Sequence, residues 1–257
     1  MGVFLTLVRA SWRAQTHYRF NFFFTTVSSG LAMFSDFLLI WWLLMNFPSL
    51  GGWKLEEVAC IFGIVNCSWG LFRVIGVGLK NFQEFMLSGR FDVLLVRPAS
   101  TVLQLLLHRF DLKSLGGVVQ GLGIGFVALT SMGLLGQLWP WFLLLCLLGA
   151  IITLEINIIL AAIAFWTIRN EEIVVLAFYA TRTASEYPAH IFGPFLKNLL
   201  TFAIPLATIG YFPLGYLLGK MQNPVALLSP FLAAGGLFPI SFVIWKMGMH
   251  HYSSTGT

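Results

Sequence analysis

Three ionisable side chains, Asp36, Arg73 and Glu155, lie within long apolar stretches of this sequence. A charged group in the hydrocarbon core of a bilayer is costly unless it faces protein or water, so these residues are candidates for function. At about 1.5 Å per residue, Asp36 and Glu155 fall near the middle of their stretches, and Arg73 lies about 7 Å from the middle of its own. An ion pair of Arg73 with Glu155 or Asp36 could lock helices together. Alternatively, these side chains could line a transport pathway or relay protons.

The sequence lacks the motifs that would let this chain carry out catalysis itself. It has no G-x-x-x-x-G-K-[ST] segment to hold ATP in a P-loop and no H-E-x-x-H pair to hold zinc. Cys60, Cys67 and Cys146 lie within apolar stretches, without the spacing of a metal site or a disulfide framework. His250 and His251 are too few for a metal site. We therefore predict that the chain is not an enzyme and holds no metal or cofactor.

Composition indicates which elements must position these residues. Hydrophobic residues make up 58% of the 257 residues and charged residues only 10%, against roughly 25% charged residues in soluble domains. The mean hydropathy is +0.85, and six apolar stretches could each form a transmembrane helix of about 20 residues. We expect an all-α polytopic membrane protein, a single domain over 1–257, with transmembrane helices at 22–45, 57–79, 116–135, 141–166, 198–216 and 227–246.

Lys and Arg are unevenly distributed between these stretches. They are frequent in three segments, namely 1–21, 80–115 and 167–197. They are sparse in the other three, namely 46–56, 136–140 and 217–226. Because cytoplasmic loops carry the excess of Lys and Arg, we expect both termini, including the tail 247–257, to be cytoplasmic. The net charge of +5 reflects the same bias, so it gives no reason to expect nucleic acid as a partner.

Residues 1–21 are expected to form an interfacial helix, because basic and apolar residues fall on opposite faces. The basic face carries Arg9, Arg13 and His17, and the apolar face carries Phe4, Leu7, Val8 and Trp12. An ordinary cytoplasmic tail is the alternative interpretation.

Prolines and glycines mark two further features of the expected helices. Four prolines, at 188, 194, 205 and 213, interrupt the fifth stretch and predict a broken or re-entrant segment near Tyr211–Pro213, on the external side. In the third stretch, Gly117, Gly121 and Gly125 share one helix face. That face permits close approach of another helix, either within the subunit or in a dimer.

The segment 80–115 is the richest in polar residues. Lys80 and Glu84 are spaced for one helix face, Phe82, Phe85 and Met86 lie on another, and Gly89 can end the helix. Arg97-Pro98 breaks the chain before a second amphipathic helix, which is expected to begin near Ser100 and to run into the third stretch. Such a helix with aromatic and charged side chains suits either docking of a partner or packing on the membrane surface.

Short motifs in this segment resemble those of a known family. Gly89-Arg90-Phe91-Asp92 and Leu95-Val96-Arg97-Pro98, after the second of six stretches, resemble the permease subunits of type-2 ABC exporters. The segments 166–172 and 211–219 agree with this resemblance. It implies a bacterial inner-membrane subunit without ATPase activity, paired with an identical or paralogous permease and seated on separate ATPase subunits that bind ATP and Mg.

The resemblance also implies roles for individual residues. In the family, the loop after the second span carries a coupling helix that enters a groove on the ATPase, and a short re-entrant element here corresponds to Pro213–Pro224. The residues implied to contact the ATPase or to shape the loop are Lys80, Glu84, Phe85, Arg90, Asp92, Arg97, Arg169, Glu171 and Glu172. An ATP-independent secondary transporter or channel is the main alternative, and the substrate stays open.

Overall fold

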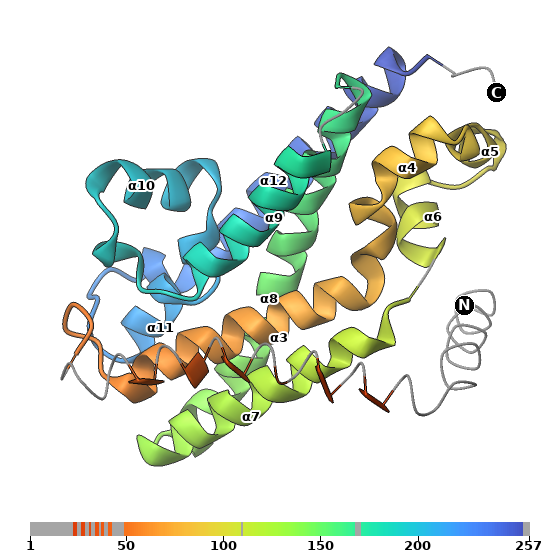
Figure 1. Cartoon of the computed structure of the whole chain (residues 1–257). Coiled ribbons are helices and arrows are strands. Elements are labelled where there is room, and N and C mark those ends of the chain that lie inside the picture. Colours follow the sequence, from red (N-terminus) through yellow and green to blue (C-terminus); the bar gives the residue numbers. More distant parts are fainter. Residues whose placement is uncertain are drawn as a thin grey trace.

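The computed structural model describes residues 49–108, 110–167 and 171–253, together with scattered positions between 23 and 42 (Figure 1). Within 171–178, only the side chains of Glu172 and Leu176 are described. The expected interfacial helix 1–21, Asp36 and Arg169 lie outside the described residues. In the described part, helices form all the regular structure apart from an isolated β-bridge between Leu50 and Trp53, so the all-α prediction is confirmed there.

The helices follow one another in chain order without intervening sheet (Figure 1). The α-helices are α3 Leu55–Lys80, α4 Phe82–Leu87, α5 Arg90–Val96, α6 Thr101–His108, α7 Leu115–Ser131, α8 Leu135–Ala162, α9 Glu171–Ser185, α10 Pro194–Asn198, α11 Tyr211–Leu217 and α12 Val225–His251. Shorter helical turns are η1 Leu112–Ser114, η2 Ile163–Phe165, η3 Ala189–Ile191, η4 Leu199–Ala203 and η5 Leu206–Thr208.

Four helical segments of the described residues are long and apolar enough to cross a membrane. They are Leu55–Leu87, Leu112–Ser131, Leu135–Phe165 and Val225–His251, and they correspond to the expected second, third, fourth and sixth spans. A bent pair, Pro194–Ala203 and Leu206–Leu217, makes a fifth if it is counted as one span. The set of six spans stays a prediction, because the stretch 22–45 is described only at scattered positions.

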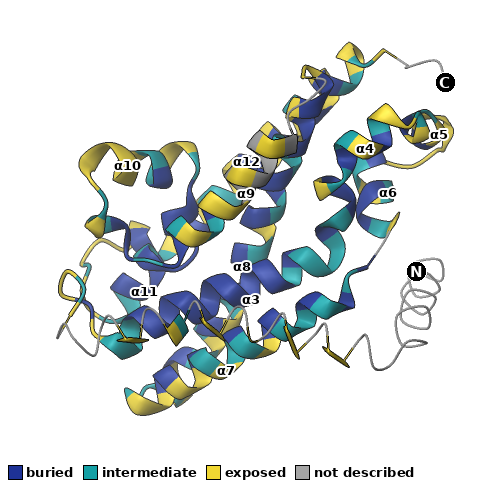
Figure 2. Cartoon of the chain, in the orientation of Figure 1, coloured by how far each residue is buried: buried dark blue, intermediate teal, exposed yellow. Residues whose placement is uncertain are grey.

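Helix α3 forms the core of the fold and packs chiefly against α7 and α8 (Figure 2). In its most apolar part 78% of the residues are buried, whereas the corresponding value for α12 is 17%. The difference follows from position, since both helices are apolar around their whole circumference. Helix α12 packs on α8 and α11 and leaves a broad apolar side exposed.

Close packing between α3 and α7 depends on the glycines. A Cβ added at Gly63 of α3 would lie 2.8 Å from the carbonyl oxygen of Gly121, and one at Gly121 would lie 2.5 Å from the backbone nitrogen of Cys67. Backbone atoms cannot yield as side chains do, so both positions require glycine. The glycine face of α7 therefore serves packing within the subunit, which was one of the two alternatives.

Helix α9 lies in the segment 167–197, which the sequence predicts to be cytoplasmic. Helix α9 packs against α3 and α8, and the Arg182 guanidinium donates a hydrogen bond to the side-chain oxygen of Asn66 at 3.0 Å. Asn66 lies near the middle of α3, which is itself a candidate span. The end of α9 therefore lies beside the middle of α3, and the cytoplasmic placement of 167–197 stays a prediction.

The break in the fifth stretch lies at a different proline from the one predicted. The chain bends by 75° between Pro194–Ala203 and Leu206–Leu217, at Ile204-Pro205. Pro213 instead lies in the first turn of α11, where a missing N–H disturbs no helical hydrogen bond. The loop after α11 is held to the start of α3, because the Lys220 ammonium contacts the Glu57 carboxylate at 2.9 Å.

Candidate functional site

The connection between α3 and α7 folds into three short helices whose ends follow local sequence signals. Gly89 has φ +67°, a left-handed conformation that favours glycine, and it separates α4 from α5 as predicted. Helix α6 begins at Thr101, as expected, with the Gln104 N–H bonded to the Ser100 carbonyl. It does not run into the third span, however. The helix ends at His108. The Asp111 N–H then donates a hydrogen bond to the Val74 carbonyl of α3 at 2.9 Å.

Buried aromatic rings anchor this connection to the ends of two membrane helices. Phe82 of α4 and Phe91 of α5 are 1% and 0% exposed. The Phe82 ring centroid lies 4.8 Å from that of Trp245 on α12 and 5.0 Å from that of Phe165, which follows α8. Trp245 also donates its indole N–H to the Thr101 hydroxyl at 2.9 Å. We call this set of rings, Phe82, Phe91, Phe165, Trp245 and Tyr252, the aromatic anchor.

The outer side of α4 and α5 presents charges. The Arg90 guanidinium pairs with the Glu84 carboxylate at 2.7 Å and donates to the Ser88 hydroxyl at 3.0 Å. It also stacks over the Phe85 ring, with 4.8 Å from its central carbon to the ring centroid. Phe85 is 5% exposed, so in this structure it supports Arg90 from below instead of forming a surface contact, and it fits the loop-shaping role.

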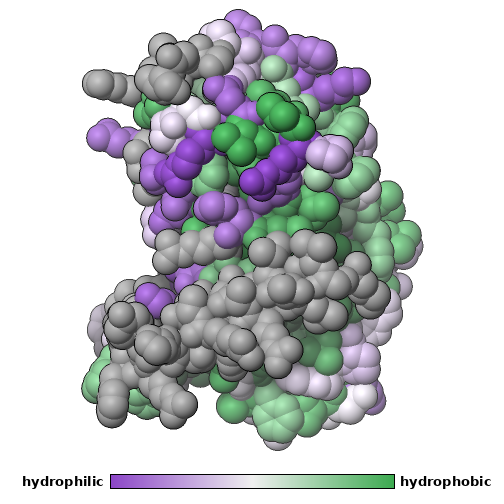
Figure 3. Space-filling model, turned by 90° about the vertical axis from the view of Figure 1, so that its right-hand side faces the viewer, coloured by the Kyte–Doolittle hydropathy of each residue, from purple (hydrophilic) through white to green (hydrophobic). Residues whose placement is uncertain are grey.

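The same two helices carry exposed aliphatic side chains. They are Leu87, Val93, Leu95 and Val96, of which Val96 is 85% exposed. On the side of the molecule that carries these helices, apolar surface lies next to strongly hydrophilic surface (Figure 3). A surface ion pair of this kind contributes only about 0–1 kcal/mol to stability. This ion pair therefore adds little to the stability of the chain.

The structure also describes Arg97, Glu172 and Asp92 of the predicted contact residues. Arg97 is exposed immediately after α5, and Glu172 is exposed at the start of α9. Asp92 is half-buried near Tyr252. Burial raises the pKa of the Tyr252 phenol, and the neighbouring Asp92 carboxylate raises it further. Asp92 therefore belongs to the contact between α5 and the end of α12.

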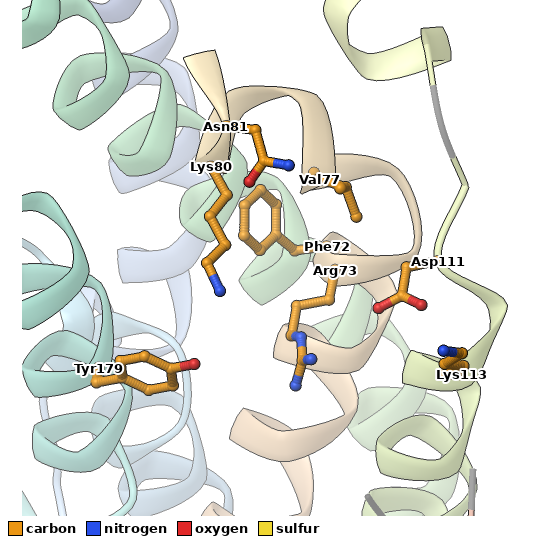
Figure 4. A pocket seen from close by; sticks show the side chains of 9 residues that line it. Phe72, Arg73, Val77, Lys80, Asn81, Asp111, Lys113 and Tyr179 are labelled. Carbon is orange, nitrogen blue, oxygen red and sulfur yellow. The ribbon is translucent and has the colours of Figure 1, made fainter. Parts of the chain in front are cut away.

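The charges within the apolar stretches do not form the expected pair in this structure. Among the described residues, no ion pair joins Arg73 to Glu155. Glu155 is 4% exposed on α8, and its Oε2 atom has no hydrogen-bond partner among the described residues. Arg73 lies half-buried on α3 and lines a pocket together with Lys80 (Figure 4).

One buried ion pair was not predicted from the sequence. Arg182 and Glu186 of the α9 region form an ion pair at 3.1 Å, with side chains only 15% and 5% exposed. The Asn66 side chain bridges them, since it accepts a hydrogen bond from Arg182 at 3.0 Å and donates one to the Glu186 carboxylate at 3.2 Å. The spacing of four residues between Arg182 and Glu186 is a signal that the sequence does contain.

Residues 31–256 match a family model described as "ABC-2 family transporter protein". No curated protein and no solved structure matches this chain. The matched residues include α4 and α5, the aromatic anchor and every candidate span of the described part.

Proposed function

This chain belongs to the ABC-2 transporter family and is a permease component, and we propose that it couples ATP hydrolysis on a separate subunit to export. Members of this family generally work with an ABC ATPase partner. In the proposal, ATP and Mg bind to that partner, and the coupling surface of this chain consists of α4, α5 and Arg97. A second permease chain, identical or paralogous, completes the transporter.

The observation that carries this proposal is the attachment of α4 and α5 to the membrane helices. A coupling element must be exposed on one side and rigidly held on the other. Glu84 and Arg90 provide the exposed, ordered side, with side chains 68% and 49% exposed. The aromatic anchor provides the rigid side, because it packs both short helices against the ends of α8 and α12.

The mechanism follows from this two-sided arrangement. When the ATPase subunits close on ATP, they move the coupling surface. Buried rings in close contact cannot absorb much displacement, because protein interiors are packed at near-crystalline density. The displacement therefore passes to α8 and α12 and shifts the population of membrane conformations. This chain supplies no chemistry to the hydrolysis step.

A double variant tests whether the surface docks the ATPase. Arg90→Ala combined with Asp92→Ala removes the ion pair with Glu84 and a charge of α5, and is expected to leave the chain inserted in the membrane. We expect recovery of the ATPase subunit with the purified chain in mild detergent to fall about tenfold or more, the equivalent of one charge-assisted contact.

Lys197→Ala is the matched control, because it removes an exposed charge from α10, far along the chain from this surface. That variant should retain the ATPase subunit. Full ATPase recovery and unchanged ATP-dependent transport by the double variant would overturn the docking role. A purified chain that transports actively without any nucleotide-hydrolysing subunit would overturn the proposed function as a whole.

A further inference from the structure

A pocket of about 310 Å³ opens beside the end of α3, and three cationic side chains line it (Figure 4). Arg73 and Lys80 come from α3, and Lys113 comes from η1, just before α7. Tyr179 of α9 forms part of the opposite wall, with the Lys80 ammonium 5.9 Å from its ring centroid. Residues from three separate parts of the sequence thus converge on one cavity.

The pocket has an excess of positive charge. Asp111 is the one acidic residue of its lining, so the three cations and one carboxylate give a formal charge of +2. The Asp111 carboxylate accepts a hydrogen bond from the Ser114 hydroxyl at 2.9 Å. Among the described residues, neither Arg73 nor Lys113 has a hydrogen bond or an ion pair. Three like charges around one cavity repel each other, and an anionic ligand would offset that repulsion.

The position of the pocket relative to the membrane narrows the choice of anion. Both α3 and the segment that contains η1 are candidate spans. Arg73 precedes Lys80 by seven residues, or about 10 Å along the helix. The pocket therefore extends from the helix end, where lipid headgroups lie, into the apolar layer. Cations at this depth are the usual partners of anionic headgroups.

We propose that this pocket binds a phosphate ester, with Arg73, Lys80 and Lys113 as its ligands. The planar guanidinium of Arg73 matches two phosphate oxygens, and the lysine ammonium groups add charge without fixed geometry. The headgroup of an anionic lipid and a soluble phosphate ester share this chemistry, and the experiment separates them. The proposal is independent of ATPase coupling, because it concerns binding by this chain alone.

The test measures lipid binding to the full-length chain in neutral detergent by native mass spectrometry. The probes are dioleoyl-phosphatidylglycerol, dioleoylglycerol as its phosphate-free counterpart, and glycerol 3-phosphate as a soluble competitor. We expect Arg73→Gln and Lys113→Gln each to weaken binding of phosphatidylglycerol about tenfold, as for loss of one charge-assisted hydrogen bond. Lys246→Gln, which removes an exposed charge of α12 outside the pocket, should bind as the parent chain does.

Asp111→Asn distinguishes ligand binding from a structural role, because it should tighten phosphatidylglycerol binding by removing the one negative charge. An asparagine can still accept from Ser114, so the local fold is expected to persist. Displacement of the lipid by an equal concentration of glycerol 3-phosphate would assign the site to a soluble ester, and its failure to displace would assign the site to lipid. Equal binding of phosphatidylglycerol and dioleoylglycerol, or parental affinity in both Gln variants, would disprove the proposal.

Discussion

At the residue scale, buried charges distinguish this protein more than any catalytic motif. Arg182, Glu186 and Asn66 form a hydrogen-bonded network, in which each side chain contacts the other two. Glu155 and Arg73 do not share a partner among the described residues. Charges that are satisfied within the fold favour a structural role, and unpaired ones favour contact with something outside the chain.

The network predicts how its members respond to mutation. Arg182→Met leaves the Glu186 carboxylate buried without its cation, which we expect to cost about 3 kcal/mol of unfolding free energy. The double variant Arg182→Met/Glu186→Met removes both charges and should be more stable than either single variant. Thermal unfolding of the four proteins in one detergent measures this cycle. Additive losses in the double variant would show that the two side chains are not coupled.

At the scale of single elements, close helix contact limits which residues can stand at the α3–α7 interface. Gly63→Ala should destabilise the fold, because its Cβ would lie 2.8 Å from a backbone oxygen of α7. Gly123→Ala is the matched control on α7 itself, since a Cβ there meets nothing within 4 Å. Alanine is the better helix former by roughly 0.5–1 kcal/mol, so that variant should be slightly stabilised. The melting temperatures of the two variants should therefore move in opposite directions, and a shift of the same sign would contradict this packing.

The same elements show which helices the sequence pattern could predict and which it could not. Runs of apolar residues predicted α3, α7, α8 and α12 to within six residues at each end, because lipid selects for hydrophobicity along the whole helix. Helix α9 was not predicted, because Arg169, Arg182 and Lys197 gave its segment the composition of a cytoplasmic loop. The four-residue spacing of Arg182 and Glu186 is visible in the sequence. The contact of Arg182 with Asn66, 116 residues earlier in the chain, leaves no local signal. The break at Pro205 was likewise ambiguous, since four prolines of the region could have produced it.

The local structure of the segment 80–115 was predicted in part, for a similar reason. The glycine and proline signals placed the ends of α4, α5 and the start of α6 correctly, because turn conformations depend on nearby residues. The burial of Phe82 and Phe91 depends on rings at the ends of α8 and α12 and could not be derived from their spacing. Phe85, for which the resemblance implied contact or loop shaping, is buried and stacks on Arg90.

At the scale of the whole molecule, docking and transmission are separate properties of the same loop. In the proposed mechanism, the ATPase docks on the exposed side of α4 and α5, with the ion pair of Glu84 and Arg90. The aromatic anchor, which joins the loop to α8 and α12, transmits the movement. A variant that loosens only the anchor should therefore keep the ATPase bound and yet fail to pass its movement to the membrane.

Trp245→Phe makes this separation testable, because it retains an aromatic ring and removes the hydrogen bond to Thr101. Loss of this bond should cost about 1 kcal/mol, too little to unfold the chain. We expect normal recovery of the ATPase subunit, together with a weaker ATP-dependent change in hydrogen exchange at the end of α12. Phe82→Ala, which removes a fully buried ring, should abolish that change at a larger cost of about 3–5 kcal/mol in stability. If both variants respond to ATP as the parent complex does, the force must reach α12 by a route other than these rings.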